Sequence, residues 1–173
     1  MMDSLILPLA EENLSDYADV IRKSFATVAR DFALTKDNYP RHTSFISDDQ
    51  LKSKISSGYY PFGLYIEGII VGFVSLTDME NGVFEMNHFS VLPEYRHYGY
   101  GKKLLCFCKN KVIELGGNKI IIEIIEENTV LKKWYIANEF THIEAKQYEG
   151  VPFTVGHMEW EIKKNSLNRL LSY

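Results

Sequence analysis

Alternating and helically spaced apolar residues divide the chain into strand-like and helix-like segments. Residues 4–9 alternate weakly between apolar and polar and predict a first strand. Apolar residues with helical spacing follow from 13 to about 30 and predict an amphipathic helix. A second, shorter helix is predicted from Ser47, which forms a capping box with Gln50, to about Ser57.

The middle of the chain has the pattern of β-hairpins. Short apolar runs are separated by glycine-containing turns at Glu67-Gly68 and Asn81-Gly82, and Pro93 stops the last run. Strands joined by such short turns are antiparallel neighbours. The predicted strands cover 62–66, 69–77 and 83–91.

A helix and a further strand follow the hairpins. Helical spacing over 101–115 ends at Gly116-Gly117, where glycine is the usual helix stop. The run 119–125 is almost continuously apolar, as expected of a central strand buried on both faces. Strand, helix and strand across 83–125 form a βαβ unit, so its two strands should be parallel with a right-handed crossover.

One more helix and two strands complete the pattern. Asn128 is predicted to cap a helix that ends at about Asn138, and strands are predicted at 140–148 and 154–162. The fold class is therefore α+β (α/β mixed). It has a central, mostly antiparallel seven-stranded sheet with one parallel pair, flanked by about four helices.

The composition is that of a globular chain. Its 173 residues, 46% hydrophobic and 24% charged, suit one domain that buries its own core. No apolar run reaches the roughly 18–20 residues of a membrane span. The N-terminus lacks the basic patch and long apolar stretch of a signal peptide, so we expect a cytoplasmic protein. Cys106 and Cys108 fit neither a disulfide framework nor a zinc site, so structural thiols and no metal are expected.

Charge is distributed unevenly. The formal net charge is −4, but residues 96–119 hold six basic residues and one acid, a charge of +5, which leaves −9 for the remainder. Residues 67–94 hold acids and no Lys or Arg. The net negative charge disfavours a nucleic-acid partner, whereas the positive segment is compatible with either a solvated helix face or an anion site.

The positive segment begins in a glycine-containing loop, 96–101, between a predicted strand and a predicted helix. Unpaired amides and the helix dipole favour a phosphate at such a place. Two familiar nucleotide loops do not match. A Walker loop needs Ser or Thr after Lys102, where Lys103 stands, and a dinucleotide fingerprint needs a third glycine where Leu104 stands.

The same loop resembles the pyrophosphate-binding motif R/Q-x-x-G-x-G/A of the GNAT superfamily of N-acetyltransferases, through Arg96, Gly99 and Gly101. The predicted order of elements is similar to that family's over nearly the whole chain. A second family motif, N-x6-Y-x4-F, is matched by Asn128, Tyr135 and Phe140.

The resemblance implies an N-acetyltransferase domain at 1–163 and a C-terminal tail at 164–173. The chain departs from the family at Glu139, where glycine is usual. That glycine commonly serves as a left-handed helix C-cap, and Asn138 is expected to take over the role.

The resemblance further implies acetyl-CoA as cosubstrate, lying across the splayed parallel strands, and requires no metal. Its pantetheine and thioester would lie along the backbone of Phe89, Ser90 and Val91. Asn128 matches the residue that hydrogen-bonds the pantetheine arm, and a plain role as helix N-cap stays open beside it. The phosphates would be held by the amides of Arg96, His97, Tyr98, Gly99, Tyr100, Gly101 and Lys102.

The implied chemistry needs an acid and a base. Tyr135 matches the family's usual acid, which protonates the leaving CoA thiolate; core packing is its alternative. Glu85 stands where some relatives keep a glutamate base, and an exposed strand carboxylate is its alternative. We expect Glu85, or a water held by Glu85 and Asn87, to deprotonate the amine. Strand periodicity places both residues on one face with Phe89 and Val91, whose amide would stabilise the oxyanion.

The acceptor is defined only as a primary amine of a small molecule or peptide, attacked directly in a ternary complex. Acidic residues around the strands favour a cationic amine. No nucleic-acid or membrane partner is expected, and a homodimer stays open because dimers are common in the family. Two other functions also stay open: a catalytically silent acyl-CoA sensor on the same fold, and a small nucleotide-binding domain.

Overall fold

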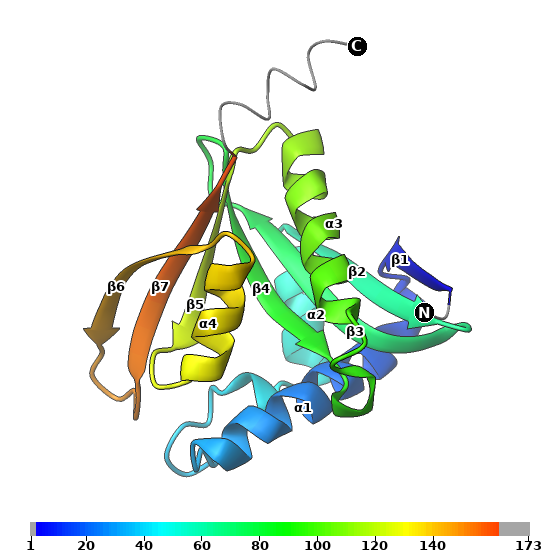
Figure 1. Ribbon diagram of the computed structural model, residues 1–173. Helices are drawn as coiled ribbons and strands as arrows, with labels where there is room; N and C mark the ends of the chain where they lie inside the picture. The colour runs from blue at the N-terminus through cyan, green and yellow to red at the C-terminus, as the bar shows by residue number, and fades with distance from the viewer. Residues whose placement is uncertain (1–2, 163–173) are drawn as a thin grey trace. The chain divides into compact units, whose positions relative to one another are not determined.

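The structure, a computed structural model, describes residues 3–162 (Figure 1). Its elements in chain order are β1 (Ser4–Pro8), α1 (Leu14–Asp31), α2 (Asp48–Ser56), β2 (Tyr59–Ile66), β3 (Ile69–Asp78), β4 (Val83–Val91), α3 (Tyr100–Glu114), β5 (Lys119–Ile125), α4 (Thr129–Ala137), β6 (Thr141–Gln147) and β7 (Thr154–Glu161). Short 3-10 turns lie at Glu11–Asn13, Thr43–Phe45 and Pro93–Tyr95.

The strands described form a seven-stranded sheet in the order β1-β2-β3-β4-β5-β7-β6. The sheet is mostly antiparallel, and β4 and β5 form its parallel pair. The α+β fold class, the mixed sheet and the order of elements predicted from the sequence are therefore confirmed.

The contacts of the chain group into two compact units. Among the described residues, the first unit holds 3–78 together with Met86–Cys108, and the second holds Met79–Glu85 together with 109–162. Both β4 and α3 contribute residues to each unit. The single acetyltransferase domain expected at 1–163 stays a prediction, and the predicted tail lies outside the described residues.

Helices α1 and α2 belong to the first unit and begin where the sequence predicts. In α2 both halves of the capping box are present: Oγ of Ser47 accepts from the Gln50 amide at 3.1 Å, and Oε1 of Gln50 accepts from the Ser47 amide at 2.9 Å. Helix α1 buries Tyr17, Val20 and Ile21 and packs on β3, while α2 packs on β2. The amphipathic spacing thus places one face of α1 in the core.

The hairpins are also formed, with one shifted boundary. The β2–β3 turn has positive φ at Glu67 (50°) and Gly68 (81°), the combination that matches the twist of adjacent strands. Strand β2 begins at Tyr59 and not at 62, so Pro61 lies inside it. The Pro61 carbonyl accepts from the Leu9 amide at 3.0 Å, a bond that needs no N–H from the proline.

The second unit contains the parallel pair. Its register runs from Val83 opposite Lys119 to Glu85 opposite Ile121, and the ladder recorded among the described residues ends there. Strand β7 lies between β5 and β6 and pairs with each in antiparallel register. The parallel pairing predicted from the βαβ pattern is confirmed.

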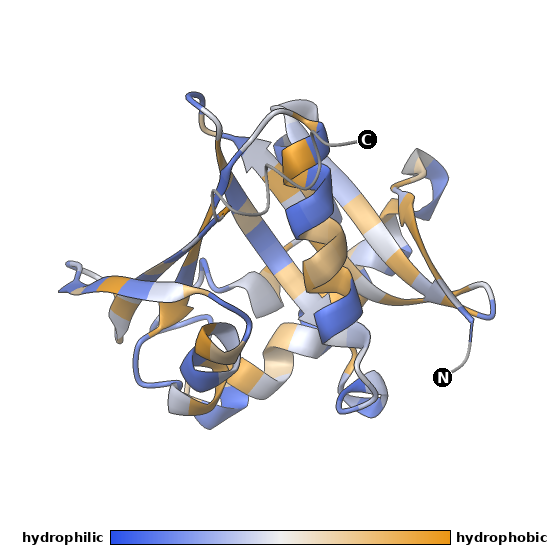
Figure 2. Cartoon of the chain, turned by 45° about the horizontal axis from the view of Figure 1, so that its top comes forward, coloured by the Kyte–Doolittle hydropathy of each residue, from blue (hydrophilic) through white to orange (hydrophobic). Residues whose placement is uncertain are grey.

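Helix α3 has a hydrophobic face that is buried, and Figure 2 shows hydrophobic and hydrophilic segments alternating along its ribbon. Its fully buried members are Leu104, Leu105, Cys108 and Val112. Leu115, the last residue of the helix predicted over 101–115, lies after the last helical residue and is exposed, so the predicted end was one residue too late. Cys106 is exposed and Cys108 buried, and both thiols are free.

Residues 3–162 contain neither a helix suited to span a membrane nor a cluster of metal ligands. No helix there combines the length and apolarity that a bilayer span requires. The same residues contain no cluster of three or more His, Cys, Asp or Glu side chains arranged to hold a metal ion.

Candidate active site

The loop between β4 and α3 lies in the first unit and contains the first predicted motif. Pro93 begins the 3-10 turn Pro93–Tyr95 directly after β4, and Arg96 ends it in an extended conformation. His97 and Gly99 then adopt positive φ angles of 67° and 85°. These left-handed residues turn the chain sharply before α3 begins at Tyr100.

The amides of this loop are its most informative feature. From His97 to Lys102, no amide donates to a backbone carbonyl of the residues that the structure describes. The next amide, Lys103, donates to the Gly99 carbonyl at 3.0 Å and starts the regular helical pattern. His97, Tyr98 and Gly99 are exposed, so these amides are open to a ligand. Consecutive unpaired amides at a helix N-terminus form an anion site.

Arg96 does not belong to this set of amides. Its N–H donates to the Pro93 carbonyl at 3.2 Å. Its guanidinium points into the first unit, where Nε donates to the Val91 carbonyl at 3.0 Å. Nη1 donates to Oγ1 of Thr27 at 3.1 Å, and Nη2 to the Ser24 carbonyl at 2.9 Å. The backbone amide and the guanidinium of Arg96 thus both donate to groups of the protein itself. The expectation that the Arg96 amide holds a phosphate therefore needs correction.

Most lysines of the positive segment are also engaged. Each of four donates to or pairs with a group of the described chain; the partners are Ser4 for Lys103 (2.6 Å), Glu139 for Lys109 (3.0 Å), Glu114 for Lys111 (2.8 Å) and Glu159 for Lys119 (2.9 Å). Lys102 has no such partner among the described residues. The positive charge is thus largely used in internal contacts, so phosphate binding here rests on the amides.

Strand β4 departs from regular alternation at His88, whose φ is 54°. A left-handed residue inside a strand is the mark of a bulge, which changes the side-chain order beyond it. The sequence predicted that Glu85, Asn87, Phe89 and Val91 share one face of the strand. Because the bulge at His88 follows Asn87, that prediction holds at most for Glu85 and Asn87. Asn87 donates through Nδ2 to Oγ1 of Thr77 at 3.4 Å, and Ser90 is buried with its hydroxyl on the Phe73 carbonyl at 3.3 Å.

His88 itself packs inside the first unit. Its ring contacts Tyr59 and Phe73 at centroid distances of 6.2 and 6.3 Å, and its Nδ1 lies 3.3 Å from Oγ of Ser75. Burial, with a smaller contribution from the charge of Lys54, lowers the pKa of His88 to about 4. These contacts give His88 a structural role.

Glu85 lies in the second unit, in a cavity of about 170 Å³ formed by β4, β5, β6 and β7. Beside it the lining contains Ile121, Glu123, His157 and Glu159. Strand β5 was expected to be buried on both faces, but Glu123 on this face is exposed, so that expectation was wrong. The face carries carboxylates beside an apolar side chain, a lining suited to a small cation with an aliphatic part.

Helix α4 presents the second motif, also in the second unit. Asn128 is the N-cap: its Oδ1 accepts from the Leu131 amide at 3.1 Å, so the plain capping role is confirmed. Tyr135 is buried, and its ring packs against Trp134 and Phe140 at centroid distances of 5.0 and 5.1 Å. The packing role of Tyr135 is present, and its role as an acid stays a prediction.

The end of α4 corrects one expectation. Asn138 has an ordinary φ of −105°, and it is Glu139 that adopts the left-handed conformation, with φ 71°. The helix therefore ends as it would with the family's glycine, although a side chain stands there. A left-handed non-glycine residue costs roughly 1–2 kcal/mol.

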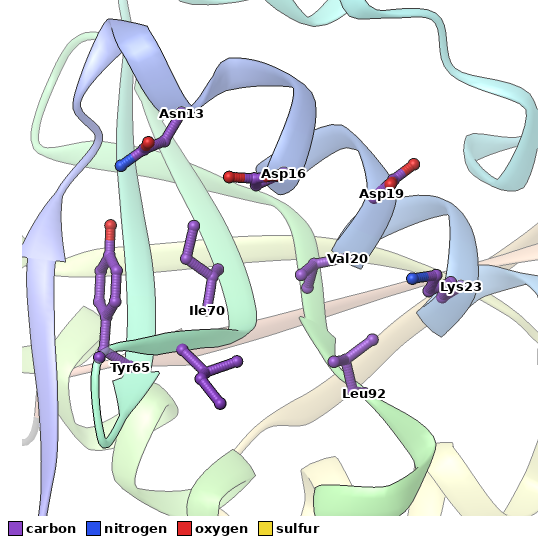
Figure 3. A pocket seen from close by; sticks show the side chains of 10 residues that line it. Asn13, Asp16, Asp19, Val20, Lys23, Tyr65, Ile70 and Leu92 are labelled. Carbon is purple, nitrogen blue, oxygen red and sulfur yellow. The ribbon is translucent and has the colours of Figure 1, made fainter.

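A second cavity, of about 400 Å³, lies in the first unit between the start of α1 and the β2–β3 turn (Figure 3). None of the predicted site residues lines it. Its polar lining comes from Asn13, Asp16, Asp19, Lys23 and Tyr65. Asp19 is already paired with Arg22, Nη2 to Oδ1, at 2.7 Å.

The sequence matches the family described as the acetyltransferase (GNAT) family over residues 25–140. This chain belongs to that family. The match includes the loop with its unpaired amides, Glu85, Asn128 and Tyr135. Acetyl transfer is thus the general activity of the family to which the chain belongs.

Solved structures of acetyltransferases share this fold. The chain is similar to the PaiA N-acetyltransferase of Thermoplasma acidophilum in complex with coenzyme A, with 19% identity, a TM-score of 0.72 and coverage of 93% of this chain and 100% of that one. It is also similar to YncA of Salmonella typhimurium, a putative acetyltransferase with its cofactor acetyl-CoA (14% identity, TM-score 0.67, coverage 94% and 95%). A GNAT-family acetyltransferase of Staphylococcus aureus gives 16% identity and a TM-score of 0.70, with coverage of 93% and 100%.

The predicted site residues divide between the two units. The loop, Asn87 and the end of β4 belong to the first unit, and Glu85, Asn128 and Tyr135 belong to the second. Sequence reasoning missed the anchors of Arg96, Ser24 and Thr27. They lie some seventy positions away in α1 (|i−j| of 72 and 69), so no local spacing could reveal them.

Proposed function

We propose that this protein transfers the acetyl group of acetyl-CoA to a primary amine of a small molecule or peptide, by direct attack in a ternary complex. The observation that carries the proposal is the run of unpaired amides from His97 to Lys102 at the start of α3, in a chain of the GNAT family. Such amides stabilise the charged oxygens of a diphosphate. The reaction needs no metal.

The donor is held by backbone groups of the first unit in this proposal. The amides of His97, Tyr98, Gly99, Tyr100, Gly101 and Lys102 hold the diphosphate. The pantetheine arm and thioester lie along the backbone of Phe89, Ser90 and Val91. On the second unit, Asn128 hydrogen-bonds the pantetheine arm in addition to capping α4.

Glu85 is proposed as the base. An amine of lysine type has a pKa near 10.4, so its deprotonation at pH 7 costs about 4–5 kcal/mol, which a base can partly recover. Glu85 lies in a cavity with Glu123 and Glu159. Glu159 is already paired with Lys119, so Glu85 and Glu123 are the carboxylates that favour an acceptor arriving as a cation. The proton leaves to Glu85 or to a water that Glu85 and Asn87 hold.

The remaining steps use Val91 and Tyr135. The amine nitrogen forms a bond to the thioester carbonyl carbon, and the Val91 amide donates to the resulting oxyanion. The carbon–sulfur bond then breaks, and Tyr135 gives its phenolic proton to the leaving thiolate. The attacking nitrogen releases its second proton to the tyrosinate, which restores the Tyr135 phenol. The products are the N-acetylated amine and CoA.

An amine-panel assay tests the proposal. The wild-type protein is incubated with acetyl-CoA and either cationic diamines, neutral amino-acid esters, acidic amino acids, or alcohols as a non-amine control. We expect CoA thiol release and acetylated product with amines, highest with the cationic ones, and none with alcohols. Tight CoA binding without thiol release by any amine would contradict the proposal and support a silent acyl-CoA sensor.

A further inference from the structure

The side chain of Arg96 joins the cofactor loop to α1. Nε donates to the Val91 carbonyl at the end of β4 at 3.0 Å. The two terminal nitrogens reach α1, where they donate to Oγ1 of Thr27 at 3.1 Å and to the Ser24 carbonyl at 2.9 Å. All of these residues belong to the first unit. One guanidinium therefore links three segments: the end of β4, the start of the loop and the second half of α1.

The receiving groups on α1 are themselves fixed. The Thr27 hydroxyl donates to the Ser24 carbonyl at 2.9 Å, so its lone pairs face the guanidinium donor. Ser24 is buried, and its carbonyl accepts from both Thr27 and Arg96. A planar guanidinium suits such a fixed set of acceptors better than a lysine ammonium does.

The charge of Arg96 has no carboxylate at ion-pair distance among residues 3–162; its acceptors are carbonyl and hydroxyl oxygens. Burial lowers the pKa of its guanidinium, while Asp31 and Glu94 act on it from a longer range. A partly buried cation without a paired anion is costly. The cost is reduced when an anion binds nearby, and the loop amides begin at the next residue, His97.

We propose that Arg96 is a positioning residue that couples α1 to the diphosphate loop. It holds the loop in its amide-exposing conformation, and its charge favours the bound diphosphate. The inference rests on the proposed function, because the anion is the diphosphate of acetyl-CoA. Arg96 acts through its hydrogen bonds to α1, so hydrogen exchange of the α1 amides should change when the cofactor binds.

Two variants test the coupling from its two sides. Arg96→Gln keeps amide donors but removes the charge, and Thr27→Val removes one acceptor on α1 without changing the loop sequence. CoA affinity should fall about tenfold or more in Arg96→Gln and about threefold in Thr27→Val. The matched control is Arg30→Gln, which removes an exposed guanidinium of α1 that pairs with Asp31. CoA affinity in this control should stay within about twofold of wild type.

Readouts beyond affinity separate this role from a merely structural one. The salt dependence of CoA binding should be weaker in Arg96→Gln than in wild type, because one charge is missing. Activity should fall with acetyl-CoA but stay near wild type with S-acetylpantetheine, which lacks the diphosphate. Hydrogen exchange of the α1 amides around Ser24 and Thr27 should slow on CoA binding in wild type and not in Arg96→Gln.

The outcomes distinguish a failure of the proposed function from a failure of the role proposed for Arg96. A wild-type protein that does not bind CoA contradicts the proposed function itself. If wild type binds CoA and Thr27→Val and Arg96→Gln bind it equally well with the same salt dependence, only the role of Arg96 is overturned. Equal losses with acetyl-CoA and S-acetylpantetheine would also overturn it, as would α1 exchange that CoA leaves unchanged in wild type.

Discussion

Lys109 of α3 forms an ion pair with Glu139 directly after α4, with 3.0 Å between Nζ and Oε2. The same ammonium donates to the Asn138 carbonyl at 2.8 Å and lies 5.8 and 5.0 Å from the ring centroids of Phe140 and Trp160. A cation at a helix C-terminus satisfies a free carbonyl and complements the dipole. This contact offsets the left-handed backbone of Glu139, so the α4 end can dispense with the family's glycine.

Replacing Lys109 by Met should destabilise the protein by about 1–3 kcal/mol, because the Asn138 carbonyl and the two rings lose their cation. The free energy of unfolding of Glu139→Gly should stay within about 1 kcal/mol of wild type. Glycine adopts the left-handed conformation without strain, and this gain offsets the lost ion pair. Urea unfolding measures both. Lys111→Met, at a more exposed pair with Glu114, is the control and should change stability by less than about 0.5 kcal/mol. A Lys109→Met variant as stable as this control would contradict the interpretation.

His88 should make stability depend on acid pH. Its pKa of about 4 in the folded protein lies below the unfolded value near 6.5, so the unfolded chain binds more protons between these values. The free energy of unfolding contributed by neutral His88 is complete above about pH 6.5. It is lost as pH falls toward 4, by about 3 kcal/mol at most.

Urea unfolding across pH 4–7 checks this prediction. His88→Asn, a residue type that tolerates positive φ, should flatten the pH slope. Burial also lowers the pKa of His42, so some slope in the same direction should remain. His97→Asn replaces a histidine that is exposed and also has positive φ, and should keep the wild-type slope. An unchanged slope in His88→Asn would show that His88 does not carry the effect.

Tyr135→Phe tests the proposed acid. Turnover should fall by roughly 100-fold, the range of general acid catalysis, while CoA affinity stays near wild type. The ring is kept, so its packing on Trp134 and Phe140 should survive. Tyr60→Phe, at an exposed position of β2, is the matched control. Wild-type turnover of Tyr135→Phe across pH 6–9 would remove Tyr135 from the acid role.

Glu85→Gln tests the proposed base separately from the acid. Turnover near pH 7 should fall by roughly 100-fold and recover partly at higher pH, where more of the amine is already neutral. CoA affinity should not change. Glu161→Gln, an exposed glutamate at the end of β7, is the control. A Glu85→Gln variant with wild-type turnover at pH 7 would contradict the assignment of the Glu85 carboxylate as the base.

Local patterns were sufficient for most of the fold. The capping box at Ser47, the glycine turns and the apolar run of β5 each depend on neighbours within a few residues, and each element formed where its pattern stands. The same holds for the motif loop, since left-handed backbone at Gly99 is intrinsic to glycine.

Features decided by distant parts of the chain could not be predicted. The inward turn of Arg96 depends on Thr27, and the pairing of Lys103 depends on Ser4, neither of which leaves a local signal. The ion pair of Glu139 likewise depends on Lys109 from another helix. The count of charges also overstated the free positive charge of the segment, because Lys109 and Lys119 pair with Glu139 and Glu159, which lie outside it.

The most direct test of the account is the affinity for CoA measured by titration calorimetry on wild type, Gly99→Glu and Gly58→Glu. Gly99 and Gly58 both have positive φ, so the control carries the same charge and similar backbone strain outside the loop. We predict that wild type and Gly58→Glu bind CoA with similar affinity, and that Gly99→Glu does not bind it. CoA binding by folded Gly99→Glu at wild-type affinity would contradict the assignment of the 97–102 amides as the diphosphate site.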